Sequence, residues 1–238
     1  MCTNYRAGSR DFIRRAFGCD ASFDYEEEAY PAYRAPIVRA GGDGAQCVAA
    51  CFGLVAHWSR DTRIARSTYN ARAETVADKP SFRRAWRQCQ FCLVPMRAFY
   101  EPCYESGRAV RWCVEAADGR EFAVAGIWES WQPPTATAWA GAPELVSFSM
   151  LTINADGHPL MQRFHAPGDE KRSIVVIEPG AYQEWLRADS TSARALLRGP
   201  DAQAYVAHAA PRVRTPAARR PAQVDSNLPA TNLNDLRS

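Results

Sequence analysis

The 238-residue sequence lacks the features that mark several common classes of protein. It contains no run of about 18 apolar residues, so we expect no transmembrane helix and no membrane partner. The opening stretch MCTNYRAGSRDF has no apolar segment of the kind that begins secreted proteins, and we therefore expect a cytoplasmic protein. No serine triad, glycine-rich phosphate loop or metal-ligand cluster stands out, so we expect no cofactor and no metal.

Cysteine is present, but its spacing indicates neither disulfides nor a zinc site. The chain has 8 cysteines. Without a secretory signal, reduced thiols are the better interpretation of that even number. Cys89 and Cys92 form a single CxxC pair inside an apolar run, and no second pair follows at the spacing of a zinc finger.

Lysine is scarce, and the net positive charge lies at one end of the chain. Only Lys79 and Lys171 are lysines among the 29 basic residues, and the net charge is +3. Residues 207–238 contain five arginines and two aspartates, which accounts for the whole +3 and leaves the body of the protein neutral. Any nucleic-acid surface in the body must therefore be a local patch of basic residues.

Apolar patterning predicts an α+β fold made of a single domain with a tail. The order of elements shows no regular β-α-β alternation, so we expect a curled, barrel-like, mostly antiparallel sheet with flanking helices. From residue 207 the chain is rich in Ala, Pro and Arg and then polar, which predicts a domain at 1–206 and a disordered tail at 207–238. Strands are expected at 46–58, 91–101, 110–115, 121–128, 145–153 and 173–177, and helices at 11–17, 81–88 and 180–189.

Cys2 directly follows the initiator methionine and is the main chemical candidate. Initiator Met is generally removed before a small residue, which would leave Cys2 with an α-amine and a thiol on adjacent carbons. The reference pKa values of these groups are near ~7.8 and ~8.5, so nucleophilic forms of both exist at neutral pH. Such an amine condenses with an aldehyde to a Schiff base, and the thiol can then close a thiazolidine ring. The alternative interpretation is a chance cysteine at a frayed terminus.

Further motifs follow Cys2 in a fixed order. The chain opens with MCTNYR and continues with FGLVAHW (52–58), NARAET (70–75), CLVPMRAFYE (92–101), FAVAGIWESW (122–131), SFSMLTINAD (147–156) and a histidine, His165, ahead of KRSIVVI. This ordered set resembles the MCGR, WGLIPxW, NARxET, CLxPADGFYEW, FAxAGLWExW and HxRMPxxL segments of the SOS response associated peptidase (SRAP) family. The matches cover about residues 1–190.

The resemblance implies a specific chemistry. Members of this family sense abasic sites in single-stranded DNA and form a covalent thiazolidine crosslink through the N-terminal cysteine. The matching catalytic residues here are Cys2, Asn70, Glu101 and His165. Asn70 would orient the Cys2 amine or the sugar, Glu101 would shuttle protons, and His165 would act on the deoxyribose oxygens and support lyase-like reversal of the crosslink. Family members also cleave off their own propeptide, but here removal of Met1 alone would expose Cys2.

The resemblance also implies residues that bind DNA. Arg72 matches a phosphate contact of the family, and Arg172 stands where the family has an arginine after its histidine. Trp58 is a candidate for base stacking, and Lys79 and Arg83 for contacts to the DNA backbone. We expect a monomer that associates with the nucleoid when it is bound to DNA.

The sequence departs from the family pattern in three places. Met96-Arg97-Ala98 replaces the family's ADG, Pro102 replaces a Trp, and the spacing from His165 to Arg172 is stretched. The insertion between His165 and Arg172 predicts a local loop geometry that differs from the family's, and His165 remains the matching histidine.

Several residues have plainer interpretations. Asn70 could simply cap a turn, His158 is a rival to His165, and Glu105 is an expected surface neighbour of Glu101. His57, next to a tryptophan, is more often a packed neighbour than a catalyst.

Two other functions remain open from the residues alone. Cys2, His165 and Asn70 could serve an N-terminal-nucleophile or cysteine peptidase without DNA chemistry. A non-catalytic module that binds single-stranded or modified DNA would need the arginine patch but would not need the Cys2 amine.

Overall fold

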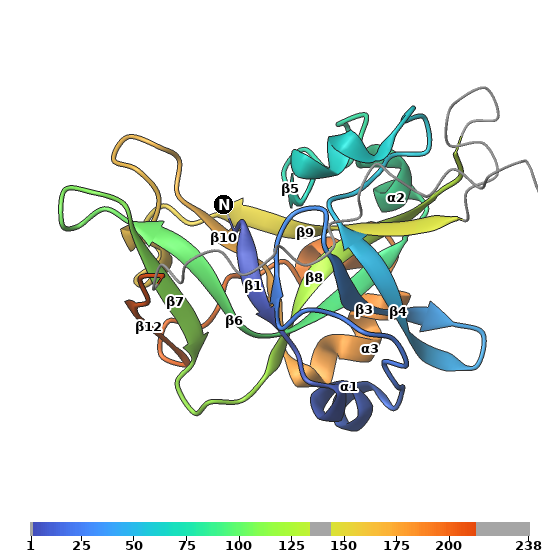
Figure 1. Cartoon of the computed structure of the whole chain (residues 1–238), viewed down its shortest axis with the longest axis horizontal. Coiled ribbons are helices and arrows are strands. Elements are labelled where there is room, and N and C mark those ends of the chain that lie inside the picture. Colours follow the sequence, from blue (N-terminus) through green and yellow to red (C-terminus); the bar gives the residue numbers. More distant parts are fainter. Residues whose placement is uncertain (1, 134–143, 213–238) are drawn as a thin grey trace, which may run out of the picture.

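The computed structural model describes residues 2–133 and 144–212 (Figure 1), and it confirms the expected α+β class with a large curled sheet. The strands are β1 Asn4–Ala7, β2 Glu28–Ala29, β3 Arg34–Gly41, β4 Gly44–Phe52, β5 Asn70–Arg72, β6 Phe91–Cys103, β7 Val110–Ala116, β8 Phe122–Trp131, β9 Leu145–Asn154, β10 Arg172–Ile174, β11 Val176–Ile177 and β12 Tyr205–Ala209. The helices are α1 Arg10–Phe17, α2 Arg83–Arg87, α3 Tyr182–Arg187 and α4 Ser192–Ala195, with short 3₁₀ turns η1 Thr62–Arg66, η2 Met161–Arg163 and η3 Pro179–Ala181.

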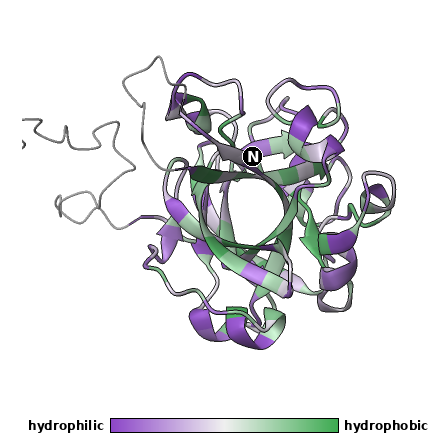
Figure 2. Ribbon diagram, turned by 90° about the vertical axis from the view of Figure 1, so that its right-hand side faces the viewer, coloured by the Kyte–Doolittle hydropathy of each residue, from purple (hydrophilic) through white to green (hydrophobic). Residues whose placement is uncertain are grey.

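The sheet closes on itself through its longest strand, β6. The hydrogen-bonded order β8-β9-β4-β3-β6 is completed by a pairing between β6 and β8, which makes a ring that is visible end-on in Figure 2. The pairings are antiparallel except those of β4 and β5 with β9. Beyond the ring, the second half of β6 pairs with β1 and β7. The N-terminal strand is therefore attached to the same strand that closes the barrel.

Both faces of β6 are buried, which explains its long apolar run. Cys92, Val94 and Met96 belong to one core cluster, whereas Phe91 and Leu93 belong to a second cluster that includes residues of α1, α2 and α3. Successive side chains of a strand point to opposite faces, so a strand covered on both sides reads as continuous hydrophobic sequence.

Two predicted strands are shorter or more broken than expected. The strand predicted at 46–58 ends at Phe52, because Gly53 has a φ of 118° and an added Cβ there would lie 2.0 Å from the Ala65 carbonyl oxygen. The strand predicted at 173–177 is two strands, β10 on β9 and β11 on β8. Val175 joins them: its N–H donates to Leu151 and its carbonyl accepts from Ala125.

Strand β12 crosses the expected boundary between domain and tail at residue 207. Ala207, His208 and Ala209 pair with Val114, Cys113 and Trp112 of β7. Residues 213–238 of the predicted tail lie outside the described part of the chain. None of the helices in residues 2–133 and 144–212 has the length and hydropathy needed to span a membrane.

Candidate active site

The pairing of β1 with β6 brings Cys2 into the protein. Asn4 lies opposite Tyr100 of β6, and Cys2, two residues before it, is completely buried. In Figure 1 the start of β1 lies close to β9 and β10. Burial raises the pKa of the Cys2 thiol well above its usual range, and the nearby Glu101 carboxylate raises it further. The thiol is therefore protonated at neutral pH.

Asn70 holds the backbone of Cys2. It is the first residue of β5 and lies beside Met150 of β9. Its Nδ2 donates a hydrogen bond of 2.9 Å to the Cys2 carbonyl oxygen. Its Oδ1 is buried and accepts no hydrogen bond from any residue in 2–133 or 144–212. The Asn70 amide thus fixes Cys2 on one side and carries a buried acceptor on the other.

Glu101 and His165 form a buried pair next to Cys2. The Glu101 side chain, on β6, is 1% exposed, and its Oε2 lies 3.2 Å from Nε2 of His165. The backbone N–H of His165 donates to the Pro102 carbonyl oxygen at 2.9 Å, so the residue after Glu101 also holds the histidine in place. His165 has a φ of 67°, a left-handed conformation that costs about 1–3 kcal/mol in a residue other than glycine.

Lys171 holds the loop that carries this histidine. Its Nζ donates to the carbonyl oxygens of His165 at 3.2 Å and Ala166 at 3.0 Å. The sequence prediction did not include Lys171, because its role depends on where the stretched loop folds back. The ammonium group of Lys171 therefore ties the end of the inserted loop between His165 and Arg172 back to its start.

The rival residues have other partners. His158 Nε2 lies 2.7 Å from the Pro200 carbonyl, and its Nδ1 accepts from two backbone N–H groups, so it fastens a turn. Glu105 pairs with Arg163 at the surface. Nδ1 of His57 lies 3.3 Å from Oε1 of the buried Glu129. The structure thus places His165, and not His158, beside Glu101.

Two features of this region were not predicted from the sequence. Tyr69 lies near Cys2 and Glu101: burial raises the pKa of its hydroxyl, and both neighbours raise it further. A cavity of about 760 Å³ extends from Glu101 and Thr3 to three arginines, Arg108, Arg111 and Arg212. Arg108 and Arg111 lie on the turn and strand after β6, so only the folded hairpin brings them beside Glu101.

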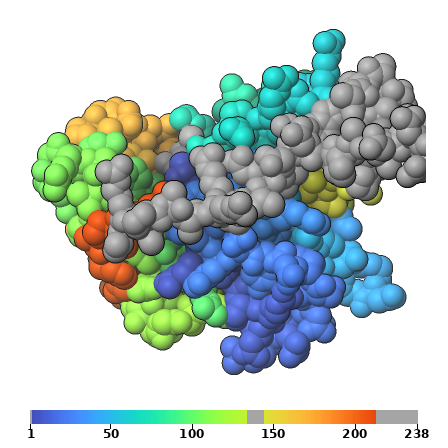
Figure 3. All heavy atoms as spheres, in the orientation of Figure 1, coloured from blue at the N-terminus to red at the C-terminus, as the bar shows by residue number. Residues whose placement is uncertain are grey.

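The exposed DNA-binding candidates lie along the segment between β4 and β6. Trp58 is 52% exposed, and its indole Nε1 donates to the Pro80 carbonyl at 3.3 Å, next to Lys79 and close to Arg83. Lys79 and Arg83 are exposed, as is Arg72, which pairs with Glu170 at 2.8 Å. In Figure 3 the cyan and teal part of this segment forms a ridge above the blue N-terminal strands.

Arg172 is not part of that exposed surface. Its side chain is 2% exposed, and its guanidinium donates to the carboxylates of Glu74 and Glu170 and to the Thr152 carbonyl. An arginine so enclosed cannot reach a phosphate without breaking these bonds. It anchors the loop that carries Glu170, which in turn pairs with Arg72.

The folded chain thus sets Cys2 beside Asn70 and the buried pair of Glu101 and His165. Comparison with known proteins identifies the class more narrowly. The family model of the SOS response associated peptidase (SRAP) matches residues 1–215, and the chain belongs to this family.

Relatives and solved structures agree with this membership. The abasic site processing protein YoqW of Bacillus subtilis is 28% identical over 141 residues, which cover 59% of this chain and 57% of YoqW. YoaM, an abasic site processing protein of the same organism, is 28% identical over 142 residues, or 59% of this chain and 56% of YoaM. The chain thus matches less than two thirds of either relative.

A protein from Bordetella bronchiseptica has a solved structure with a TM-score of 0.80 and 32% identity, covering 88% of this chain and 99% of that one. A protein from Bacteroides thetaiotaomicron shares the fold, with a TM-score of 0.72 at 21% identity over 87% of this chain and 91% of that one.

Proposed function

We propose that this protein processes abasic sites in single-stranded DNA and that Cys2, once Met1 is removed, forms a covalent thiazolidine with the sugar aldehyde. The observation that carries the proposal is the enclosure of Cys2 by Asn70 and by the buried Glu101–His165 pair. Membership of the SRAP family, and the names of the YoqW and YoaM relatives, support DNA with abasic sites as the substrate.

The protonation state of Cys2 sets the order of the steps. Because burial raises the pKa of the thiol, the neutral α-amine is the better nucleophile and attacks the aldehyde first. The resulting carbinolamine loses one water to give a Schiff base. The thiol sulfur then adds to the imine carbon and its proton passes to the nitrogen, which closes the ring. The net reaction joins amine, thiol and aldehyde and releases one water.

Glu101 and His165 supply the proton transfers. An abasic sugar is mostly a closed ring, so a base must take the proton of its anomeric hydroxyl while an acid protonates the ring oxygen. The paired carboxylate and imidazole, 3.2 Å apart, can divide these two tasks. The same acid can then protonate the departing hydroxyl of the carbinolamine. In the reverse direction, the same proton transfers would open the thiazolidine ring and, with the uptake of one water, release the DNA.

Asn70 positions the nucleophile. Its Nδ2 already binds the Cys2 carbonyl, and its Oδ1, which has no hydrogen-bond partner among the described residues, can accept a hydrogen bond from the Cys2 amine after Met1 leaves. An amine held in this way against a bound aldehyde gains many orders of magnitude in effective concentration. Trp58, Lys79, Arg83 and Arg72 would hold the strand, whereas Arg172 would act indirectly through Glu170 and Arg72.

The peptidase alternative is less well supported by the geometry. A cysteine peptidase attacks with a thiolate, but burial and Glu101 both disfavour the ionised form of Cys2.

The test is crosslinking of the purified full chain to an abasic single-stranded oligonucleotide. Cys2→Ala should abolish the heat-stable adduct while the protein remains folded. Cys2→Ser should form no stable adduct alone but should still be trapped by borohydride, because it keeps the amine. Full adduct formation by Cys2→Ala would overturn the proposal, as would turnover of a peptide substrate without any adduct.

A further inference from the structure

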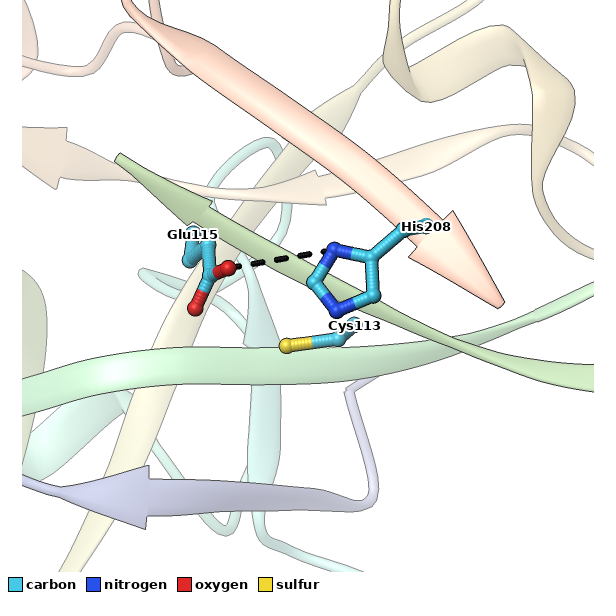
Figure 4. Close-up of side chains that lie close together, drawn as sticks. All are labelled: Cys113, Glu115 and His208. Carbon is cyan, nitrogen blue, oxygen red and sulfur yellow. Dashed lines mark ion pairs between the residues drawn. The ribbon is translucent and has the colours of Figure 1, made fainter. Parts of the chain in front are cut away.

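A second group of reactive side chains lies on the neighbouring strands β7 and β12. Cys113 and Glu115 are two residues apart on β7 and therefore point to the same face. His208 of β12 lies directly opposite Cys113 in the antiparallel register. Figure 4 shows the three side chains converging from the two strands. One ligand atom from each lies within 4.8 Å of the other two, and Nδ1 of His208 is 3.8 Å from Oε1 of Glu115.

The surroundings orient these groups toward one another. Arg6 binds Oε2 of Glu115 at 3.4 Å, which leaves Oε1 facing His208. Cys113 is buried, whereas the side chains of Glu115 and His208 are partly exposed, so solvent reaches two of the three groups.

We propose that Cys113, Glu115 and His208 bind a Zn²⁺ ion that fastens the edge strand β12 to β7. Thiolate, imidazole and carboxylate are the ligands that zinc prefers, and three of them leave one position for water. Tetrahedral bonding would bring the ligand atoms to roughly 3.3–3.6 Å from one another. Glu115 and His208 have side chains 32% and 54% exposed, so both are free to close by the ångström required.

The charges allow this site. The thiolate and carboxylate balance the two charges of the ion, and Arg6 can stay on the second carboxylate oxygen. Arg6 and Arg111 lower the affinity by repulsion but do not occupy the ligand atoms. Zinc at this place would also steady the segment after β12, where Ala210 bonds Arg111 and Arg212 bonds the Tyr30 hydroxyl. That segment lines the cavity beside Glu101.

The experiment is equilibrium dialysis of the full-length protein against Zn²⁺, with bound metal measured by plasma mass spectrometry. Co²⁺ serves as a second probe, because thiolate ligation gives it an intense absorption band. We expect one bound ion per chain. His208→Gln, at a half-exposed position that should not disturb folding, should weaken binding about tenfold or more, and Cys113→Ser should remove the cobalt–thiolate band.

Two matched variants separate this site from other thiols. Cys2→Ala removes the thiol that is proposed to react with the sugar, and Cys89→Ser removes the more exposed half of the CxxC pair. Both should bind Zn²⁺ as the unchanged protein does. The inference is overturned if no ion binds, if binding survives His208→Gln and Cys113→Ser unchanged, or if it is lost in Cys2→Ala. It is independent of the proposed DNA chemistry.

Discussion

At the scale of single residues, side chains of the same type differ sharply in their surroundings. Glu101 is buried beside His165, whereas Glu105, four residues later, is half-exposed and binds Arg163. The sequence alone pointed to Glu101 through its FYE motif and its apolar neighbours. The burial of Arg172 could not be predicted from the sequence, because the carboxylates that enclose it, Glu74 and Glu170, come together only in the folded protein.

We expect Glu101→Gln to slow adduct formation about 10²–10⁴-fold, the usual contribution of a general acid–base group. DNA affinity should change little, because the amide keeps the size and most hydrogen bonds of the carboxylate. Glu105→Gln is the matched control and should react normally. Single-turnover crosslinking at saturating oligonucleotide, measured between about pH 5 and 9, decides between them. A slow Glu105→Gln, or a Glu101→Gln that loses only affinity, would contradict the assignment.

At the scale of elements, the sequence predicts that a strand or helix exists more readily than where it ends and which strand it pairs with. The long apolar run of β6 and the Ser9-capped helix α1 both carry strong local signals. The break at Val175 carries none, because it arises from hydrogen bonds to two different strands. The histidine loop is a similar case: its shape depends on Lys171 reaching back to the carbonyls of His165 and Ala166.

Substitution of the two lysines of the chain should therefore affect different steps: Lys171→Met the rate of crosslinking, and Lys79→Met the affinity for DNA. Lys171→Met keeps the aliphatic stem but loses the donors that hold His165 in its left-handed conformation. A bond from a charged donor contributes about 1.5–3 kcal/mol, so we expect crosslinking at saturating DNA to slow by roughly tenfold or more, with little loss of affinity. Lys79→Met should weaken DNA binding and reduce its salt dependence, with a normal rate at saturation. Titrations of rate against DNA concentration distinguish the two, and the reverse pattern would refute the loop argument.

At the scale of the whole molecule, residues 1–206 carry no net charge, so the proposed DNA binding would depend on a local surface. The exposed basic candidates lie on the ridge that carries Trp58, and further arginines line the cavity beside Glu101. Residues 213–238 hold Arg214, Arg219, Arg220 and Arg237 against Asp225 and Asp235, a net charge of 4 − 2 = +2. In the proposed function these charges would add to the long-range attraction of DNA, and none of the residues of the proposed site lies among them.

We predict that deletion of residues 213–238 leaves crosslinking at saturating DNA unchanged and gives a shallower dependence of affinity on salt. Deletion from residue 207 should be worse, because it removes Ala207, His208 and Ala209 from β12 and exposes the edge of β7. Thermal unfolding of the two truncations, together with crosslinking, makes the comparison. Loss of crosslinking in the shorter deletion would show that the C-terminal residues belong to the site.

The proposed chemistry requires the amine and the thiol of one residue, Cys2, to capture the abasic sugar. Its most direct test is mass spectrometry of the N-terminal peptide before and after reaction with abasic single-stranded DNA. We predict that the reactive protein begins at Cys2 and that the modified peptide carries the sugar remnant on Cys2, with the loss of one water. A reactive protein that still begins at Met1, or an adduct on any other residue, would contradict the account.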